Sequence, residues 1–265
     1  MIQLTREVRC SLIADAAERP VTNSWGGWPA ATAIAPYVIF RCTLAGEPDS
    51  ASGYLCNIKL IDDAIRQQVI QPACDRFTDM TLERLTVFAF ESLRESFPKN
   101  CYLQQLQLVA TPTLQYSIQS ERSGMIQLTQ EFEFSASHRL HNPELSDDEN
   151  QQLFGKCNNP NGHGHNYVLQ VTLEGEANIS GTLLPLQPFE AMVKQTVIDR
   201  LDHRHLNVEL EEFRSLNPSV ENIAMVIWNL LEQPVRGLGN GTARLARVRV
   251  FETPKTWADY QGAIH

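Results

Sequence analysis

The sequence predicts an α+β protein built from two tandem units, each with the element order ββααββ. One reason is an internal repeat, in which MIQLTREVRCSL at Met1 recurs as MIQLTQEFEFSA at Met125. Another is the pattern within each copy, where alternating apolar and polar segments flank two segments with helical spacing. An antiparallel sheet with both helices on one face buries such segments, so we expect this arrangement in each unit.

Three further pairs of segments recur in the same order along the two copies. They are CTLAGE with VTLEGE, TLERLTVFAFESL with SVENIAMVIWNLL, and QLVATPT with RVFETPK. Insertions and deletions fall between these blocks, where loops are expected. We therefore expect the copies to join near residues 120–124, giving one domain over 1–122 and a second over 123–265.

The second copy shows the expected elements most clearly. Residues 126–137 and 167–174 alternate as the strands of a long hairpin, and 245–252 alternate as a later strand. A first helix is expected to open near Pro188, because proline suits a helical first turn. A second is expected from Ser219 as N-cap. Its apolar face would comprise Val220, Ile223, Ala224, Ile227 and Leu231.

Composition narrows the class of function. The chain has 265 residues and a formal net charge of -9, which argues against nucleic acid or an anionic membrane as the main partner. It shows neither an apolar segment near its start nor an apolar run of about 18 residues. We expect a cytoplasmic protein with a small-molecule partner. Free thiols are favoured over disulfides for five cysteines without C-x-x-C spacing, namely Cys10, Cys42, Cys56, Cys74 and Cys101.

The histidines are confined to the second copy. None of the seven lies within the first 137 residues. His163 and His165 are two apart on an expected strand and therefore share a face, and a hairpin would bring His138 opposite them. A single histidine there would usually be an ordinary polar residue, but three together indicate a metal. Three neutral imidazoles leave the fourth position of a tetrahedral zinc open, as in catalytic sites.

The first copy provides an internal control for this prediction. At the matching positions it carries Ala14, Ile34 and Pro36, none of which binds metal. It also has no cysteine at the place of Cys157, which precedes the two histidines in GKCNNPNGHGHNY. We therefore expect a metal site in the second copy and a structural role for the first.

The motifs of the second copy carry a family resemblance. GKCNNPNGHGHNY, SASHRL, LDHRHLN, PSVENIAMVIW and VFETP lie in order and span most of 125–262. They resemble the 6-pyruvoyl-tetrahydropterin synthase family, zinc enzymes of the tunnelling fold that also include the 6-carboxytetrahydropterin synthases of 7-deazaguanine (queuosine) biosynthesis. The first copy resembles the family only in its scaffold. Five residues separate Cys157 from His163, as in the pyruvoyl-forming enzymes, whereas the carboxy-forming enzymes usually show C-x-x-x-H-G-H.

The resemblance implies a carbon–oxygen lyase of tetrahydrobiopterin biosynthesis. Its substrate would be 7,8-dihydroneopterin triphosphate, which loses triphosphate as 6-pyruvoyl-tetrahydropterin forms. Zinc would be held by His138, His163 and His165, and Cys157 would act as the general base. Asp202 and His203 would supply the cationic neighbour that a thiolate needs. His205 would be a bystander or an alternate relay.

The resemblance also implies a substrate-binding set. Glu252 would accept the pterin's 2-amino and N3 hydrogens, and Ala110 of the first copy occupies the matching place. Ser219 and Glu221 would lie near the pterin. The alternative for Glu221 is structural, because the helix dipole stabilises an acid at a helix start and the first copy keeps Glu83 at the matching place. A zinc-dependent pterin-binding protein without turnover is the second class of function. A pure assembly module is the third.

The family's rings imply an assembly for this chain. Such rings close three domains into a barrel, which removes exposed sheet edges, and each site forms between neighbours. We expect a homotrimer in which three second copies form one catalytic barrel and three first copies form an inert one. The alternative is a mixed ring of four domains from two chains.

Overall fold

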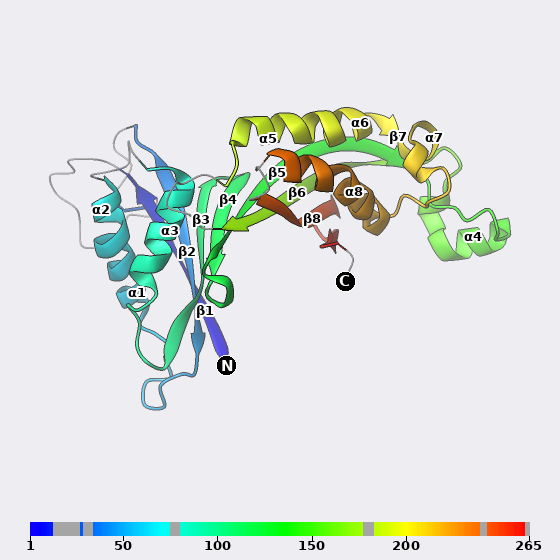
Figure 1. The fold of residues 1–265 in the computed structure, drawn as a ribbon. Helices are drawn as coiled ribbons and strands as arrows, with labels where there is room; N and C mark the ends of the chain where they lie inside the picture. Colours follow the sequence, from blue (N-terminus) through cyan, green and yellow to red (C-terminus); the bar gives the residue numbers. More distant parts are fainter. Residues whose placement is uncertain (13–26, 29–33, 75–79, 177–182, 239–242, 263–265) are drawn as a thin grey trace. The chain divides into compact units, whose positions relative to one another are not determined.

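The computed structural model describes residues 1–12, 27–28, 34–74, 80–176, 183–238 and 243–262 (Figure 1). The chain folds into two compact units. The first takes in residues 1–128 and 175–183, and the second 129–174 and 184–265. Both are antiparallel sheets with helices, so the expected α+β class is confirmed. Ala14, one of the positions matched to the histidines, lies outside the described residues.

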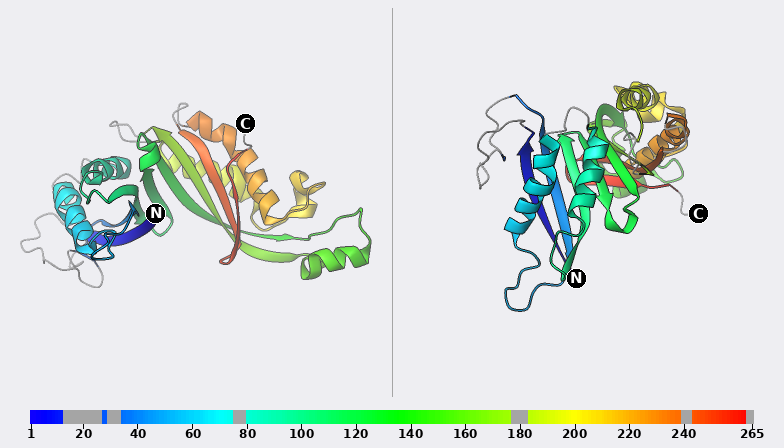
Figure 2. Two further views of the ribbon diagram at one scale, coloured as in Figure 1. Left: turned by 90° about the horizontal axis from the view of Figure 1, so that it is seen from below. Right: turned by 60° about the vertical axis from the view of Figure 1, so that its left-hand side comes forward.

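The first unit has a four-stranded antiparallel order and two helical segments. Its strands are β1 (Ile2–Ser11), β2 (Tyr37–Gly46), β3 (Cys101–Thr111) and β4 (Leu114–Gln119), each paired with the next. Its helices are α1 (Ile58–Ala64), which continues through the π-helical turn η1 (Ile65–Ile70) into α2 (Gln71–Cys74), and α3 (Leu82–Leu93). Figure 2 shows both helical segments side by side over the strands.

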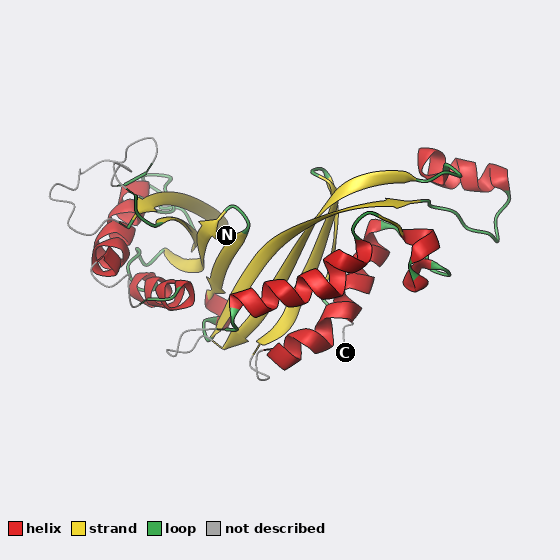
Figure 3. Cartoon of the chain, turned by 90° about the horizontal axis from the view of Figure 1, so that it is seen from above, coloured by secondary structure: helices red, strands yellow, loops and turns green. Residues whose placement is uncertain are grey.

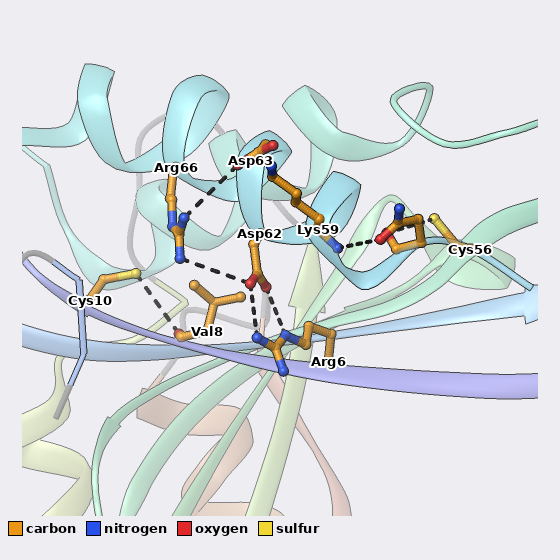
Figure 4. Close-up of polar contacts among 9 residues, drawn as sticks. Arg6, Val8, Cys10, Cys56, Lys59, Asp62, Asp63 and Arg66 are labelled. Carbon is orange, nitrogen blue, oxygen red and sulfur yellow. Dashed lines mark hydrogen bonds and ion pairs between the residues drawn. The ribbon is translucent and has the colours of Figure 1, made fainter. Parts of the chain in front are cut away.

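An ion-pair cluster joins β1 to α1 in the first unit (Figure 4). The Arg6 guanidinium donates two hydrogen bonds to the Asp62 carboxylate, at 2.7 and 2.8 Å. Arg66, one helical turn along, lies 3.9 Å from the same carboxylate and stacks over the Trp28 ring. Asp62 and Arg66 are both buried, so this carboxylate balances cationic charge inside the unit.

The second unit has four main strands in the order β5-β6-β8-β9. They are β5 (Met125–His138), β6 (His163–Glu176), β8 (Ala243–Thr253) and β9 (Thr256–Tyr260), and the short β7 (Arg204–His205) pairs with β5 in parallel. The helices are α5 (Leu186–Val193), the π-helical turn η5 (Lys194–Ile198), α6 (Asp199–Leu201) and α8 (Val220–Leu238). In Figure 3, α5 and α8 cross the strands side by side.

The two predicted helices of this unit form, with one shift at a boundary. The first begins at Leu186, so Pro188 occupies the third helical position rather than the first. That position is compatible with proline because the N–H groups of the first turn have no intrahelical acceptor. Ser219 precedes the second helix, and its hydroxyl accepts a long 3.4 Å hydrogen bond from the Asn222 amide. All five residues of the expected apolar face are buried.

The connections of this unit contain short elements that we did not predict. Between β5 and β6 lie α4 (Asp147–Phe154) and the 3-10 turn η4 (Gly155–Asn158), which Figure 3 shows beyond the ends of both strands. Between β7 and α8 lie α7 (Leu206–Glu209) and the 3-10 turn η6 (Glu211–Phe213). A capping box starts α4, since Ser146 and Glu149 bond each other's backbone N–H.

The five cysteines of the first copy are buried and form no disulfide, as expected, and Cys157 is unbridged and partly exposed. The apolar core of the second unit includes Phe189 of α5, Ile223 of α8 and Val248 of β8. No described helix is long and apolar enough to cross a membrane.

The Arg6–Asp62 pair generates a stability prediction. Replacing Asp62 by alanine leaves Arg6 and Arg66 without this carboxylate beneath α1, so the free energy of unfolding should fall by about 3 kcal/mol. Urea denaturation followed by circular dichroism measures the change. Glu91→Ala is the matched control, because Glu91 pairs with Arg94 on an exposed surface and its loss should cost under about 1 kcal/mol. Equal effects of the two substitutions would contradict the role given to Asp62.

Candidate metal and pterin site

Three histidines converge where β5 ends and β6 begins. His138 is the last residue of β5, and His163 and His165 lie at the first and third positions of β6. The ring centroid of His138 lies 4.5 Å from that of His163 and 5.3 Å from that of His165. One potential ligand atom from each ring lies within 4.8 Å of the other two. Within the described part of the chain, this is the one such group of three or more His, Cys, Asp or Glu residues.

The environment of His138 prepares one nitrogen as a ligand. Its Nδ1 lies 2.6 Å from the carbonyl oxygen of Pro218, just before α8. A carbonyl only accepts, so Nδ1 carries the proton and the Nε2 lone pair faces the other histidines. Burial lowers the pKa of His138 to about 4, which keeps the ring neutral near pH 7. A metal requires this uncharged form.

The spacing of the triad fits a small divalent cation. The Nε2 atoms of His138 and His163 lie 3.1 Å apart. With Zn–N bonds of about 2.0–2.1 Å, two ligands of a tetrahedral zinc lie about 3.3 Å apart. Among the described residues, buried His165 Nε2 has no hydrogen-bond partner. A bound cation would satisfy that lone pair, so the histidines present suit zinc.

Glu252 and Tyr167 complete the surroundings of the triad. Glu252 lies near the end of β8, with Oε1 3.5 Å from His138 Nε2 and 3.6 Å from His165 Nε2. Tyr167 follows His165 on the same face of β6, and its buried hydroxyl has no hydrogen-bond partner among the described residues. Burial, followed by the charges of Glu252 and Cys157, raises the pKa of Tyr167. We did not predict a role for Tyr167, although its i+2 spacing from His165 was a visible signal.

The loop that carries Cys157 is fixed to the end of β5. The Leu140 amide donates to the Cys157 carbonyl at 2.9 Å, and the Arg139 guanidinium donates to both oxygens of Asn158. His141 Nδ1 lies 3.1 Å from the same Asn158 side-chain oxygen. The thiol is partly exposed, so Cys157 is held by its backbone while its side chain stays accessible.

Asparagine side chains replace strand partners beyond β5. The Asn207 side chain accepts from the Arg139 amide at 2.8 Å and donates to the Arg139 carbonyl at 2.9 Å. Asn217 accepts from the His141 amide at 3.1 Å. Fully buried Asn150 bonds the Asn142 amide and carbonyl. These bonds satisfy the backbone of a segment that has left the sheet, and sequence analysis did not identify them.

Asp202 and His203, between α6 and β7, form a hydrogen-bonded pair that is tied to Ser135 of β5. His203 Nδ1 lies 2.8 Å from Asp202 Oδ2, and the other carboxylate oxygen accepts from the Ser135 amide at 2.7 Å. The Ser135 bond, followed by the His203 bond, lowers the pKa of Asp202. The His203 side chain is 82% exposed, and its backbone φ of 58° is the one positive value among the described non-glycine residues. The imidazole therefore faces solvent from a conformation that histidine rarely adopts.

Gly162 and His205 both lie next to His138. His205 pairs with Ser137 through β7, one residue before His138. Gly162 has φ +72°, and a Cβ there would lie 2.8 Å from His205 Nε2 and 3.0 Å from the His138 carbonyl oxygen. Glycine is therefore required in this turn for both its conformation and its size.

The remaining two predicted residues lie at the start of α8. Ser219 follows Pro218, whose carbonyl orients His138, so Ser219 is a chain neighbour of the site. Glu221 lies in the first turn of α8 and is exposed. The structure thus brings together the triad and Glu252 and places Ser219 next to them. It leaves His203 and Glu221 exposed, with Asp202 partly buried against Ser135.

Known proteins match nearly all of the second unit. The sequence profile described as 6-pyruvoyl tetrahydropterin synthase matches residues 127–263. Over 142 residues the chain is 40% identical to the 6-pyruvoyl tetrahydrobiopterin synthase of Homo sapiens, a match covering 53% of this chain and 94% of that protein. It is 25% identical over 158 residues to the 6-carboxy-5,6,7,8-tetrahydropterin synthase of Haemophilus influenzae, covering 52% of this chain and 99% of that protein.

A solved structure gives a similar match. The 6-pyruvoyl tetrahydropterin synthase of Caenorhabditis elegans aligns with a TM-score of 0.48 at 37% identity, covering 52% of this chain and 96% of that one. The profile match includes all three histidines, Cys157 and Glu252 and takes in about half of the chain. The chain belongs to the 6-pyruvoyl tetrahydropterin synthase family.

Proposed function

We propose that this protein converts 7,8-dihydroneopterin triphosphate to 6-pyruvoyl-tetrahydropterin with loss of triphosphate, in a zinc-dependent reaction. The observation that carries the proposal is the histidine triad, which lies inside the family match and has the spacing of zinc ligands. The identity to the human pyruvoyl-forming enzyme, 40% against 25% for the carboxy-forming relative, favours the pyruvoyl product. Tetrahydrobiopterin biosynthesis is the corresponding pathway.

The reaction is internally balanced in electrons. Two side-chain carbons of the substrate are oxidised from alcohols to ketones, which releases four electrons. Two of these electrons reduce the dihydropterin ring, and two reduce the terminal carbon to a methyl group as triphosphate leaves, so no external oxidant or reductant is required. His138, His163 and His165 would hold the metal, which when bound would polarise the substrate hydroxyls as a Lewis acid. The reaction also requires proton transfer and the departure of triphosphate, and residues of this chain would carry out both steps.

Cys157 is the proposed general base. As thiolate it would take a proton from the hydroxyl-bearing carbon next to the terminal carbon, and the electron pair of that C–H bond would form the double bond of an enol. The bond between the terminal carbon and the triphosphate oxygen would break at the same time, and its electron pair would leave with that oxygen. Its accessible side chain and fixed backbone suit this role. Asp202 orients His203, whose exposed imidazole would support the thiolate of a neighbouring chain.

Glu252 is the proposed pterin anchor. Its carboxylate would accept the 2-amino and N3 hydrogens of the ring, with Ser219 and Glu221 nearby at the start of α8. Its present position beside His138 and His165 allows a competing role as a further metal ligand. Substitution can separate the two roles because they affect different measurements.

The proposal includes a division of labour between two domains. Residues 123–265 would be catalytic, and 1–122 would be a degenerate copy with a structural role. A π-helical turn interrupts the first helical segment of each unit, at Ile65 in one and Lys194 in the other, which supports a duplication. Three chains would assemble through their second domains, so that each site receives His203 from a neighbour.

Incubation with 7,8-dihydroneopterin triphosphate tests the proposed function. We expect release of one triphosphate per turnover and a product with the mass of 6-pyruvoyl-tetrahydropterin. The mass of 6-carboxytetrahydropterin would assign the alternative activity. Binding of the pterin without any product would assign a binding protein instead.

Glu252→Gln separates anchor from metal ligand. The purified wild-type protein should carry about one zinc per chain, measured by plasma emission spectrometry. As an anchor, the variant should keep this zinc and show KM raised by about tenfold, because an amide cannot accept both pterin hydrogens. Loss of zinc in the variant would make Glu252 a ligand. If zinc content and KM were both unchanged, Glu252 would have neither role.

Cys157→Ala tests the base. The variant should keep its fold and zinc, because the loop is held by backbone bonds that alanine preserves. Turnover should fall by about 100-fold or more, because the proposed base is lost. Cys101→Ala, at a buried thiol of the first unit, is the control and should retain activity. Full activity of Cys157→Ala would place the base elsewhere.

The same variant tests the shared site. Inactive Cys157→Ala chains mixed with inactive His203→Ala chains, after dissociation and reassembly, should regain part of the activity, and light scattering should report three chains. A dimer, or no recovery despite demonstrated exchange of chains, would contradict the assembly.

A further inference from the structure

One cavity of the second unit is lined by chain neighbours of the triad but by none of the triad residues themselves. Its volume is about 380 Å³, within the range of roughly 300–1,000 Å³ that small-molecule sites occupy. The polar residues that line it are Arg139, His141, His205, Asn207, Arg214, Ser215 and Asn217. Among its described lining residues there is no aspartate or glutamate, although the chain as a whole carries a net charge of -9.

A neighbouring cavity shows that this composition is local. That cavity shares Arg214 but is lined by Asp199, Glu209, Glu211 and Glu212, whose carboxylates balance its arginines. In the cavity lined by Arg139, its guanidinium donates only to the neutral oxygens of Asn158, and no described carboxylate pairs with it. Its positive charge is therefore not neutralised by the protein.

Arg214 can also turn toward an anion at low cost. It pairs with Glu211 at 3.1 Å, but the two side chains are 66% and 73% exposed. Exposed pairs of this kind contribute about 0–1 kcal/mol, so a multiply charged ligand can displace the carboxylate. Asn207, Asn217 and Ser215 add neutral groups that can donate hydrogen bonds.

Chain connectivity sets the cavity beside the triad. Arg139 directly follows His138, and Asn217 directly precedes Pro218, whose carbonyl bonds His138. His205 lies opposite Ser137 across β5 and β7. The cavity is therefore lined by chain neighbours of the triad, and it brings two arginines to that end of the unit.

We propose that this cavity binds the triphosphate tail of the substrate and holds the released triphosphate before it leaves. This inference rests on the proposed function, because it assigns the phosphate-bearing end of the same substrate. Arg139 is the main charge partner, and guanidinium groups match phosphate geometry. Arg214, which is exposed, supplies a second guanidinium to the same cavity.

Inorganic triphosphate is the probe. It should inhibit turnover competitively against 7,8-dihydroneopterin triphosphate. Its inhibition constant should rise about tenfold in Arg139→Gln, because a partly buried guanidinium is lost. The constant should rise about threefold in Arg214→Gln, because that guanidinium is exposed to solvent. Arg236→Gln is the matched control, since it removes the same charge from an exposed pair on α8 and should leave the constant unchanged. Arg214 makes no described hydrogen bond to the Cys157 loop, so its result stands even if Arg139→Gln disturbs that loop.

Two further measurements isolate the tail from the rest of the substrate. Phosphate-free 7,8-dihydroneopterin should inhibit wild type and Arg214→Gln equally, because it lacks the group that the cavity binds. Calorimetry with triphosphate on the chelator-treated protein should show the same loss in the arginine variants, which excludes binding through a metal.

The outcomes distinguish this inference from the proposed function. Three results, each obtained with an enzyme that turns over, would overturn the tail site alone. They are an unchanged inhibition constant of triphosphate in both arginine variants, an equal rise of that constant in Arg236→Gln, and non-competitive inhibition. Calorimetric binding that depends on Arg139 and Arg214, in a protein without turnover, would overturn the function while leaving an anion site in place.

Discussion

The hydrogen bond between His138 Nδ1 and the Pro218 carbonyl is the interaction on which the second unit's site depends. It joins the last residue of β5 to Pro218, which lies two residues before α8 and 80 positions away in the sequence. It also fixes the tautomer, so that Nε2 faces His163 and His165. The Asn222 side chain donates to the Asn217 carbonyl, which steadies the same turn. The sheet, the helix start and the ligand geometry are therefore coupled through one imidazole.

Much of this arrangement could be predicted from periodicity, and the rest depended on contacts between distant segments. Two-residue spacing placed His163 and His165 on one face of β6, and the hairpin brought His138 opposite. Asn207 and Asn217 gave no comparable signal, because an asparagine that bonds a distant backbone looks like any loop asparagine. The helix α4 was missed although Ser146 and Glu149 form a capping box, since its face has few apolar residues to reveal a period.

The two units treat a matching acid in opposite ways. Glu83, at the start of α3, is buried, bonded to Thr81 and Tyr116, and burial raises its pKa. Glu221, at the start of α8, is exposed. The same residue type thus serves internal packing in one unit and remains available to a ligand in the other. Sequence identity at a matched position did not carry this difference, because burial is decided by the residues around it.

The left-handed backbone of His203 shows where the fold gives up stability. Histidine at a φ of 58° costs about 1–3 kcal/mol, and the conformation persists because Ser135 bonds both the His203 amide and the Asp202 carboxylate. Glycine would occupy this position with less strain but would present no side chain to solvent. A chain optimised only for thermal tolerance would have little reason to keep an imidazole here. Residue 203 is therefore a place where engineering for heat resistance and preservation of chemistry demand opposite substitutions.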